Sequence, residues 1–303
     1  MKSDFIWMDG ELIPYEKATV HLITPTLHYG MGVFDGIRCY ETPRGRVVFR
    51  LREHLQRLLE SIHILGILDF PYTVEEMRQA VHQVIRANRF RECYIRPLMY
   101  LQGAMGLNMD NSRPRLGIAV WEWGAYLGEF TNDAGIHLMV SSFTRLHPNI
   151  NLTKSKATGN YVNSMLVKTL AVRSGFDEAV ILDPNGFVAE CTGENIFMLR
   201  KGVLFTPPLA MVLEGLTRAS IMTLAMDMGI PVREELFTRD QLYIADEVFI
   251  CGTAAEIVGV RMIDHRPIGK GGVGAVTQSL YQAFQENVHG RGAHSSEWLD
   301  YLD

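Results

Sequence analysis

The chain has 303 residues, of which 29 are Lys or Arg and 34 are Asp or Glu, so its formal net charge is −5. This length allows one large or two medium domains, and the negative balance argues against a nucleic-acid partner. Four separated cysteines, no leader-like segment and no apolar stretch of about 20 residues favour a cytoplasmic protein without a disulfide framework or a membrane span.

Strand-like and helix-like patterns alternate in the first part of the chain. Apolar spacing predicts a helix over residues 52–65. Thr73 followed by Glu76 is a capping box that opens a second helix. Two β-rich runs, 92–101 and 116–123, complete an α/β half.

A polar stretch at 128–135 is a candidate linker. The strands predicted after it are 137–143, 178–182, 195–199, 203–206 and 247–251, and the helices are 216–228 and 275–284. We therefore expect two α/β domains, residues 1–123 and 136–303, joined by an interdomain loop at 124–135. A ligand site is expected between them. The tail from about residue 290 shows no clear pattern.

The run Leu213-Glu214-Gly215-Leu216-Thr217-Arg218 places a glycine before an apolar-periodic helix. The first N–H groups of a helix lack internal partners and suit a phosphate, to which the Thr217 hydroxyl would add a donor. Taken alone, the run is better explained as an ordinary glycine turn with a capping threonine.

Lys156 stands in a mostly uncharged stretch, five residues before Tyr161. A buried lysine loses proton affinity and becomes the nucleophilic amine that Schiff-base chemistry needs. A surface lysine at a domain edge is the plain alternative. Lys154 would share a face with Lys156 on a strand, so the spacing does not choose between them.

Two further segments carry buried or clustered charge. Glu190 and Glu194 precede an apolar strand, where a carboxylate could pair with a protonated ring nitrogen, although capping or surface charge explains them better. In Tyr94-Ile95-Arg96-Pro97, a strand puts Tyr94 and Arg96 on one face. An arginine among apolar neighbours needs an anion, which a structural or a substrate carboxylate would supply equally well.

Other patterns exclude chemistry. The glycine-rich run 269–274 lacks the lysine-hydroxyl pair of a phosphate-binding P-loop. The ten histidines show no ligand-like pairing, so no metal is expected.

Together, these segments resemble the class IV aminotransferases, which are fold-type IV pyridoxal-phosphate enzymes, and within them the branched-chain amino-acid aminotransferases. The resemblance runs from about Ile6 to about Glu286. The motifs that carry it are His28–Gly30, Val33–Tyr40, Glu53–Leu58, Tyr94–Pro97, Trp123–Gly128, Lys156–Tyr161, Glu190–Phe197, Glu214–Arg218 and Cys251–Ile257.

The resemblance implies an α/β (α+β) fold with a smaller N-terminal domain and a larger C-terminal pseudo-barrel domain that binds pyridoxal 5'-phosphate. Lys156, not Lys154, matches the Schiff-base lysine, Glu190 the partner of the pyridine nitrogen and Tyr161 the partner of the phenolic oxygen. The remaining cofactor contacts that it implies, mainly the phosphate cradle, are Arg57, Leu213, Gly215, Leu216, Thr217, Gly252 and Thr253.

The implied reaction transfers the amino group between branched-chain L-amino acids (leucine, isoleucine, valine) and 2-oxoglutarate. Arg96, with Tyr29 and Tyr126, resembles the group that binds the distal carboxylate. The substrate residues implied are Tyr29, Phe34, Gly36, Arg38, Tyr94, Arg96, Trp123, Tyr126, Thr253 and Ala254. A homodimer or higher homo-oligomer is expected.

The sequence departs from the commonest family pattern at Asp35, where Glu is common. A D-amino-acid aminotransferase and an aminodeoxychorismate lyase share the fold and are the nearest alternatives. They are not expected to carry the Tyr94–Pro97 and Trp123–Tyr126 motifs together. A non-catalytic phosphate-binding protein is the alternative from another class, and the presence of both Lys156 and Glu190 argues against it.

Overall fold

The structure, a computed structural model, describes residues 3–124 and 134–302. The chain divides into two compact units. Unit 1 contains Met1–Trp123, Lys154–Gly159 and Asn287–Asp303, and unit 2 contains Gly124–Thr153 and Asn160–Glu286. The division after Trp123 coincides with the expected domain end. The lysine segment and the C-terminal tail, which we expected in the domain 136–303, group with unit 1.

Unit 1 is built on an eight-stranded sheet with the strand order β17-β5-β4-β6-β7-β1-β2, and β3 also pairs with β6. The strands are β1 (Phe5–Met8), β2 (Glu11–Pro14), β3 (Gly32–Phe34), β4 (Ile37–Thr42), β5 (Gly45–Phe49), β6 (Cys93–Gly103), β7 (Ser112–Trp121) and β17 (Leu299–Tyr301). The helices are α1 (Pro25–Tyr29), α2 (Leu51–Ile64), α3 (Val74–Asn88) and α8 (Ser295–Trp298), with 3-10 turns at Tyr15–Lys17 and Met109–Asn111.

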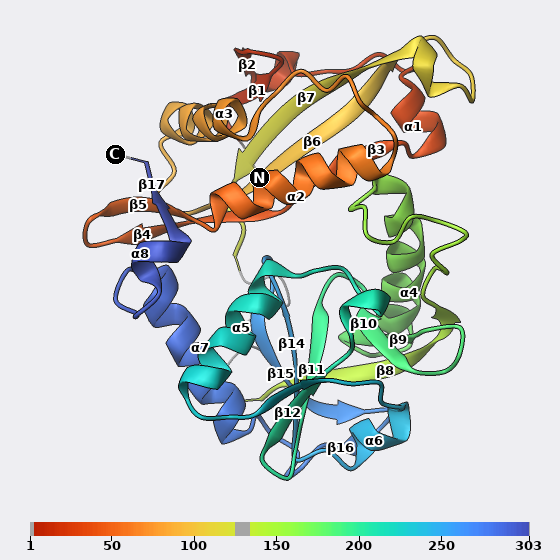
Figure 1. The fold of residues 1–303 in the computed structure, drawn as a ribbon, viewed down its shortest axis with the longest axis vertical. Helices are drawn as coiled ribbons and strands as arrows, with labels where there is room; N and C mark the ends of the chain where they lie inside the picture. The colour runs from red at the N-terminus through yellow and green to blue at the C-terminus, as the bar shows by residue number, and fades with distance from the viewer. Residues whose placement is uncertain (1–2, 125–133, 303) are drawn as a thin grey trace. The chain divides into compact units, whose positions relative to one another are not determined.

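Helices α2 and α3 pack with the sheet around one apolar core (Figure 1). The predicted helix 52–65 is α2, displaced by one residue at each end. The predicted capping box is confirmed: the Thr73 hydroxyl accepts from the Glu76 N–H, and the Glu76 carboxylate accepts from the Thr73 N–H. Strand β7 begins before the predicted run and ends at Trp121, so Trp123 follows the strand.

The ladder on one side of β6 is interrupted where the strand contains Pro97. β3 pairs with residues 98–100 and β4 with residues 93–95, so the chain leaves the sheet at Asp35 and Gly36. Pro97 has no N–H to donate there, and its carbonyl accepts from the Asp35 N–H at 3.1 Å. The interruption frees the Asp35 side chain to point away from the ladder.

The C-terminal tail, for which the sequence showed no pattern, forms α8 and then β17, which pairs with β5. Asp300 holds this edge strand to α3 through ion pairs with Arg78 at 2.6 Å and His82 at 2.8 Å. The contact joins residues more than 200 positions apart, so no local signal announces it.

Unit 2 contains a nine-stranded mixed sheet with the order β10-β9-β8-β15-β14-β11-β12-β13, and β16 pairs with β15. Its strands are β8 (Ile136–Thr144), β9 (Glu178–Leu182), β10 (Val188–Cys191), β11 (Asn195–Arg200), β12 (Val203–Thr206), β13 (Val232–Glu234), β14 (Glu247–Gly252), β15 (Glu256–Ile263) and β16 (Arg266–Pro267). Its helices are α4 (Tyr161–Arg173), α5 (Leu216–Asp227), α6 (Arg239–Tyr243) and α7 (Ala275–Val288), the last ending at the boundary with unit 1, and a 3-10 turn lies at Leu209–Met211. A further 3-10 turn, Thr158–Asn160, spans the division between the two units. The expected α/β class is confirmed.

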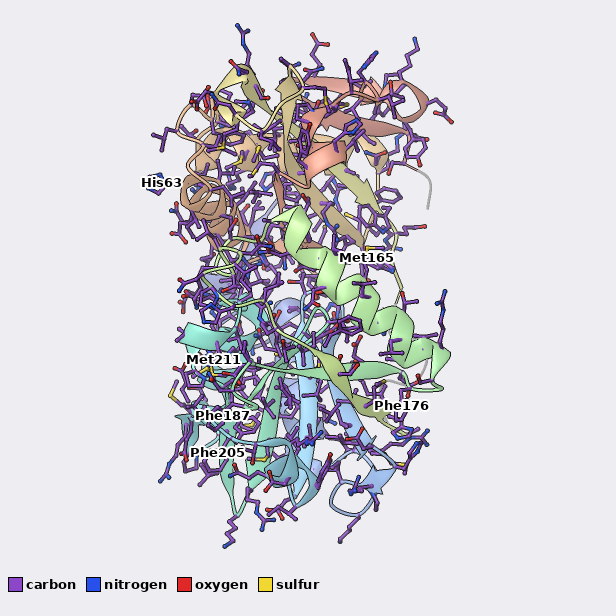
Figure 2. All side chains as sticks on the ribbon, turned by 90° about the vertical axis from the view of Figure 1, so that its right-hand side faces the viewer. His63, Met165, Phe176, Phe187, Phe205 and Met211 are labelled. Carbon is purple, nitrogen blue, oxygen red and sulfur yellow. The ribbon has the colours of Figure 1, made fainter. Side chains whose placement is uncertain are left out.

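One side of α4 is apolar and exposed. Val162, Met165, Leu166 and Val172 leave at least half of their surface accessible, and Figure 2 shows Met165 pointing away from the helix. Within the described ranges, no helix combines the length and apolarity that crossing a membrane requires.

Candidate active site

Lys156 is fixed in unit 1 by its backbone. Its N–H donates to the Ser61 hydroxyl at 3.1 Å, and its carbonyl accepts from the Phe34 N–H at 3.2 Å. The neighbouring Ser155 hydroxyl donates to the Ser61 carbonyl, and Ala157 forms a β-bridge with Val33. The segment is therefore held between α2 and β3, and it is not the strand that the Lys154–Lys156 spacing suggested.

The Lys156 amine lies in a partly apolar, charged environment. Its Nζ is 5.3 Å from the centre of the Phe34 ring. Removal from water, and then the positive charge of Arg57, lower the pKa of Lys156 to about 8, while Asp35 opposes this shift. A substantial fraction of the amine is thus unprotonated near neutral pH, as a nucleophile or general base requires.

Asp35 fixes the side chain of Arg57. The fully buried Asp35 carboxylate accepts from Arg57 Nε at 2.9 Å and Nη2 at 2.7 Å, and it also contacts His54 Nδ1 at 2.9 Å. The charges of Arg57 and His54 and their hydrogen bonds outweigh the cost of burial and keep the pKa of Asp35 well below its usual range. The guanidinium is therefore held by a bidentate contact that leaves little freedom of rotation.

An aromatic group surrounds Arg96 on the sheet. The Arg96 guanidinium lies 4.5 Å from the Phe34 ring centre and 5.2 Å from that of Tyr94, and its Nη2 donates to the Tyr94 hydroxyl at 3.1 Å. Trp123 packs edge-on against Tyr94 at 4.6 Å. Gly36 is required here, because a Cβ atom at this position would overlap the Tyr94 hydroxyl. Phe34, Gly36, Tyr94, Arg96 and Trp123 thus form one group of neighbouring residues.

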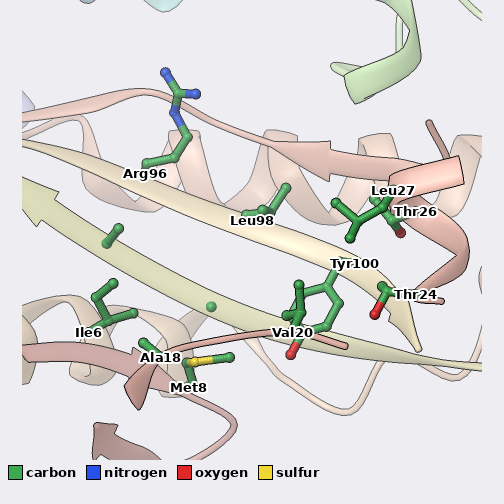
Figure 3. Close-up of a pocket in the computed structure, with 12 residues that line it drawn as sticks. Ile6, Met8, Ala18, Val20, Thr24, Thr26, Leu27, Arg96, Leu98 and Tyr100 are labelled. Carbon is green, nitrogen blue, oxygen red and sulfur yellow. The ribbon is translucent and has the colours of Figure 1, made fainter. Parts of the chain in front are cut away.

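An apolar cavity adjoins Arg96 on the same face of the sheet (Figure 3). Arg96, Leu98 and Tyr100 alternate along β6 and line it, and the positions on β7 opposite Arg96 and Leu98 are the small residues Ala119 and Gly117. The small residues keep this face open beside Arg96.

In unit 2, the Glu190 carboxylate is fixed on both oxygens. Oε1 pairs with Arg145 Nη1 at 2.9 Å, and Oε2 accepts from the Leu213 N–H at 3.1 Å. Glu194 behaves differently: burial and the nearby Glu178 raise its pKa to about 8, so it is mostly protonated at neutral pH. Glu190 is therefore the better of the two carboxylates to face a protonated ring nitrogen.

Helix α5 begins at Leu216, as the sequence predicted. Gly215 is the N-cap residue, and because glycine has no side chain, it cannot cap the start of the helix with one. A Cβ atom on Gly215 would overlap Asn195 Oδ1, and Asn195 Nδ2 donates to the Leu213 carbonyl at 3.2 Å. Thr217 is buried in the first turn. The positive end of the helix dipole at this position favours a negatively charged group.

Strand β14 ends at Gly252, and the turn after it carries Thr253 and Ala254. Cys251, the residue before Gly252, pairs with Asn195 in the β11–β14 ladder. Asn195 therefore links this turn to the Leu213–Gly215 segment and, through Leu213, to Glu190. These cofactor and substrate candidates of unit 2 form a second group.

Three other predicted residues lie on α1, β4 and α4. Tyr29 ends α1 and is about half exposed, Arg38 lies opposite Tyr94 in the β4–β6 ladder, and Tyr161 is the first residue of α4. Tyr126 lies outside the described residues.

Sequence reasoning missed several residues that support the site. Ser61 and His54 lie on the buried side of α2 with Leu58 and Ile62, and polar residues on an apolar stripe are the signal that would have indicated them. Asp35 was noted only as a departure from the family pattern. Arg145 carried no local signal.

The fold and the lysine group define a class IV aminotransferase. Residues 32–263 match the family described as amino-transferase class IV, and the chain belongs to this family.

More particular similarities agree with one another. The chain is 46% identical over 298 residues to the branched-chain-amino-acid aminotransferase of Pseudomonas aeruginosa, covering 98% of this chain and 97% of that protein. The crystal structure of the Escherichia coli branched-chain amino acid aminotransferase superposes with a TM-score of 0.97 at 44% identity, covering all of both chains. The T.th. branched-chain amino acid aminotransferase complexed with N-(5'-phosphopyridoxyl)-L-glutamate gives 0.95 at 43% identity, also covering all of both chains.

Proposed function

We propose that the protein is a pyridoxal-phosphate-dependent transaminase that exchanges the amino group between branched-chain L-amino acids and 2-oxoglutarate. The observation that carries the proposal is the Lys156 amine, with a pKa of about 8, beside the Arg57–Asp35 pair and the Phe34–Tyr94–Arg96 group. Full-length similarity to named branched-chain aminotransferases supports the substrate class.

The residues present fit the cofactor. The start of α5, which has Gly215 as its N-cap and no side-chain cap, suits its phosphate, and each Glu190 oxygen has acceptor capacity left beyond Arg145 and Leu213. The residues that would hold the cofactor are Arg57, Tyr161, Glu190, Leu213, Gly215, Leu216, Thr217, Gly252 and Thr253. When bound, the cofactor supplies an electron-withdrawing ring that stabilises negative charge at the substrate Cα.

The chain's own residues then divide the work. The Lys156 amine removes the proton from the substrate Cα and holds it on Nζ. The Glu190 carboxylate, held by Arg145, can accept a hydrogen bond from a protonated partner. Arg57, fixed by Asp35, presents a positive charge without loss of side-chain entropy.

The substrate side rests on Arg96. Its guanidinium binds the distal carboxylate of glutamate or 2-oxoglutarate, with Tyr29 and Tyr126 as further contacts. Phe34 and Trp123 supply apolar surface for a branched side chain, Tyr94 and the Thr253–Ala254 backbone bind the α-carboxylate, and Gly36 and Arg38 border the pocket.

The test compares Lys156→Ala with the matched control Lys154→Ala. Wild-type protein with the cofactor should be yellow, change colour on addition of L-glutamate and transaminate L-leucine. Lys156→Ala should lose the colour change and at least roughly 100- to 10,000-fold of activity, whereas Lys154→Ala should retain both. An unchanged spectrum in Lys156→Ala, or activity confined to D-alanine or aminodeoxychorismate, contradicts the proposal.

We also propose a homodimer or higher homo-oligomer that works in the cytoplasm. The exposed apolar side of α4 is the kind of surface that subunit interfaces cover, and all four cysteines are free and buried, as suits a reducing compartment. A monomeric mass by light scattering contradicts the assembly.

A further inference from the structure

Trp121 lies next to the proposed substrate pocket but belongs to none of the functional groups assigned above. It is the last residue of β7 and faces Tyr94 directly in the β6–β7 ladder. Its ring centre is 5.1 Å from that of Tyr94 and 5.6 Å from that of Trp123. It is also 5.9 Å from the Arg96 guanidinium carbon. Trp121 therefore lies against both Arg96 and the aromatic residues that continue the pocket wall.

Within the described ranges, no acidic side chain neutralises the positive charge of the Arg96 guanidinium. Its Nη2 donates a hydrogen bond to the Tyr94 hydroxyl, and its buried Nε has no hydrogen-bond partner in that part of the chain. The rings of Phe34, Tyr94 and Trp121 lie within the roughly 6 Å over which a ring attracts a cation. Aromatic rings orient a guanidinium while leaving its charge available to a ligand anion.

We propose that Trp121 is a positioning residue that holds Arg96, directly and through Tyr94, in the orientation that receives the distal carboxylate of glutamate or 2-oxoglutarate. The inference rests on the proposed function. A branched aliphatic side chain makes no use of the Arg96 charge, so Trp121 sets the relative affinity for the acidic and the branched substrates.

The ring of Trp121, and not its N–H group, carries this role. The indole nitrogen is buried and has no hydrogen-bond partner among the described residues, so it donates to nothing that a substitution would break. Trp121→Phe keeps an aromatic face and removes the unpaired N–H, which makes it the conservative variant. Trp121→Leu removes the ring but keeps an apolar side chain.

The experiment measures kcat and KM of the cofactor-loaded wild type, Trp121→Phe and Trp121→Leu with L-leucine and with L-glutamate. Trp121→Leu should raise KM for glutamate by roughly 3- to 30-fold, the range for loss of a desolvated cation–ring contact. Its KM for leucine should change less than about twofold, and Trp121→Phe should stay close to the wild type for both substrates. Trp121→Met, which fills the volume with a flexible chain, gives the same expectation if Trp121→Leu does not fold.

Equal changes for leucine and glutamate, or no change in Trp121→Leu, overturn the inference while the proposed function stands. A wild-type protein that transaminates neither substrate overturns the proposed function, and the inference with it. A shift in KM for glutamate alone, restored by Trp121→Phe, supports the positioning role, because a general loss of pocket structure would move both substrates together.

Discussion

Replacing Asp35 by Asn removes one charge from a fully buried ion pair while keeping the size of the side chain. The carboxylate accepts two hydrogen bonds from Arg57 and a third from its own neighbour, the Gly36 N–H, at 2.7 Å. The amide keeps only one acceptor oxygen. Its NH2 group is itself a donor, so it cannot accept a hydrogen bond from the Arg57 guanidinium. The Arg57 guanidinium, whose side chain is only 12% exposed, loses the negative charge of Asp35.

Removing one partner from such a pair costs about 3–5 kcal/mol of unfolding free energy. Glu41→Gln is the matched control, because the Glu41–Arg91 pair has similar distances but lies on the surface, and it should cost no more than about 1 kcal/mol. Urea titration of both variants and the wild type at pH 7 measures the two losses.

The pH dependence gives a second check on Asp35. The folded-state pKa of Asp35 lies below its unfolded value of about 3.9, so its stabilising contribution is present above that pH and is lost as the pH falls below it. The difference between the wild type and Asp35→Asn should therefore shrink in acid. A loss under about 1 kcal/mol at pH 7, or a difference that grows in acid, refutes the reasoning.

Three further predictions concern the lysine, a close contact and a helix cap. In the cofactor-free protein, the Lys156 amine should react with an acylating reagent at a rate that rises with pH around a midpoint near 8, because only the unprotonated amine attacks. Peptide mass mapping measures the extent of acylation at each pH. A midpoint at the ordinary lysine value contradicts the pKa argument. Gly36→Ala should displace Tyr94 and raise KM for both leucine and glutamate, whereas Gly124→Ala, where a Cβ atom meets nothing within 4 Å, should leave KM unchanged. Steady-state kinetics measures both variants, and equal KM values for the two variants contradict the prediction. Thr73→Ala should remove the capping box, lower the unfolding free energy by about 1 kcal/mol and leave kcat unchanged. Urea titration and activity assays measure these two quantities, and an unchanged stability contradicts the prediction.

Local patterns predicted α2, α3, α5 and α7, because caps and apolar spacing act within a few residues, but they did not predict α4, whose apolar residues are not confined to one face. The capping box at Thr73 and the start of α5 at Leu216 are both where the sequence placed them. The choice between Lys154 and Lys156 was not available locally. It depends on the Ser61 hydroxyl, 95 residues away, and on the Phe34 N–H, which only the folded chain brings to Lys156.

The contacts that hold the site residues in place could not be predicted from local sequence patterns either. The Asp35–His54–Arg57 contacts depend on the chain leaving the sheet opposite Pro97, and the pairing register of β3 and β4 decides where that happens. Arg145 reaches Glu190 from a distant part of the sequence, with nothing in either segment to mark the partner. The family resemblance indicated the residues that face the ligand but not those that hold them.

Three consecutive residues at the interruption of the β6 ladder serve three different groups: the Phe34 N–H contacts Lys156, the Asp35 carboxylate holds Arg57, and Gly36 makes room for Tyr94. Each position can vary by itself, but one added or deleted residue would assign all three to the wrong partners at once. Among homologues, we therefore expect this stretch to accept substitutions while its length stays invariant. An alignment with a gap inside it would then mark a protein that has lost the activity.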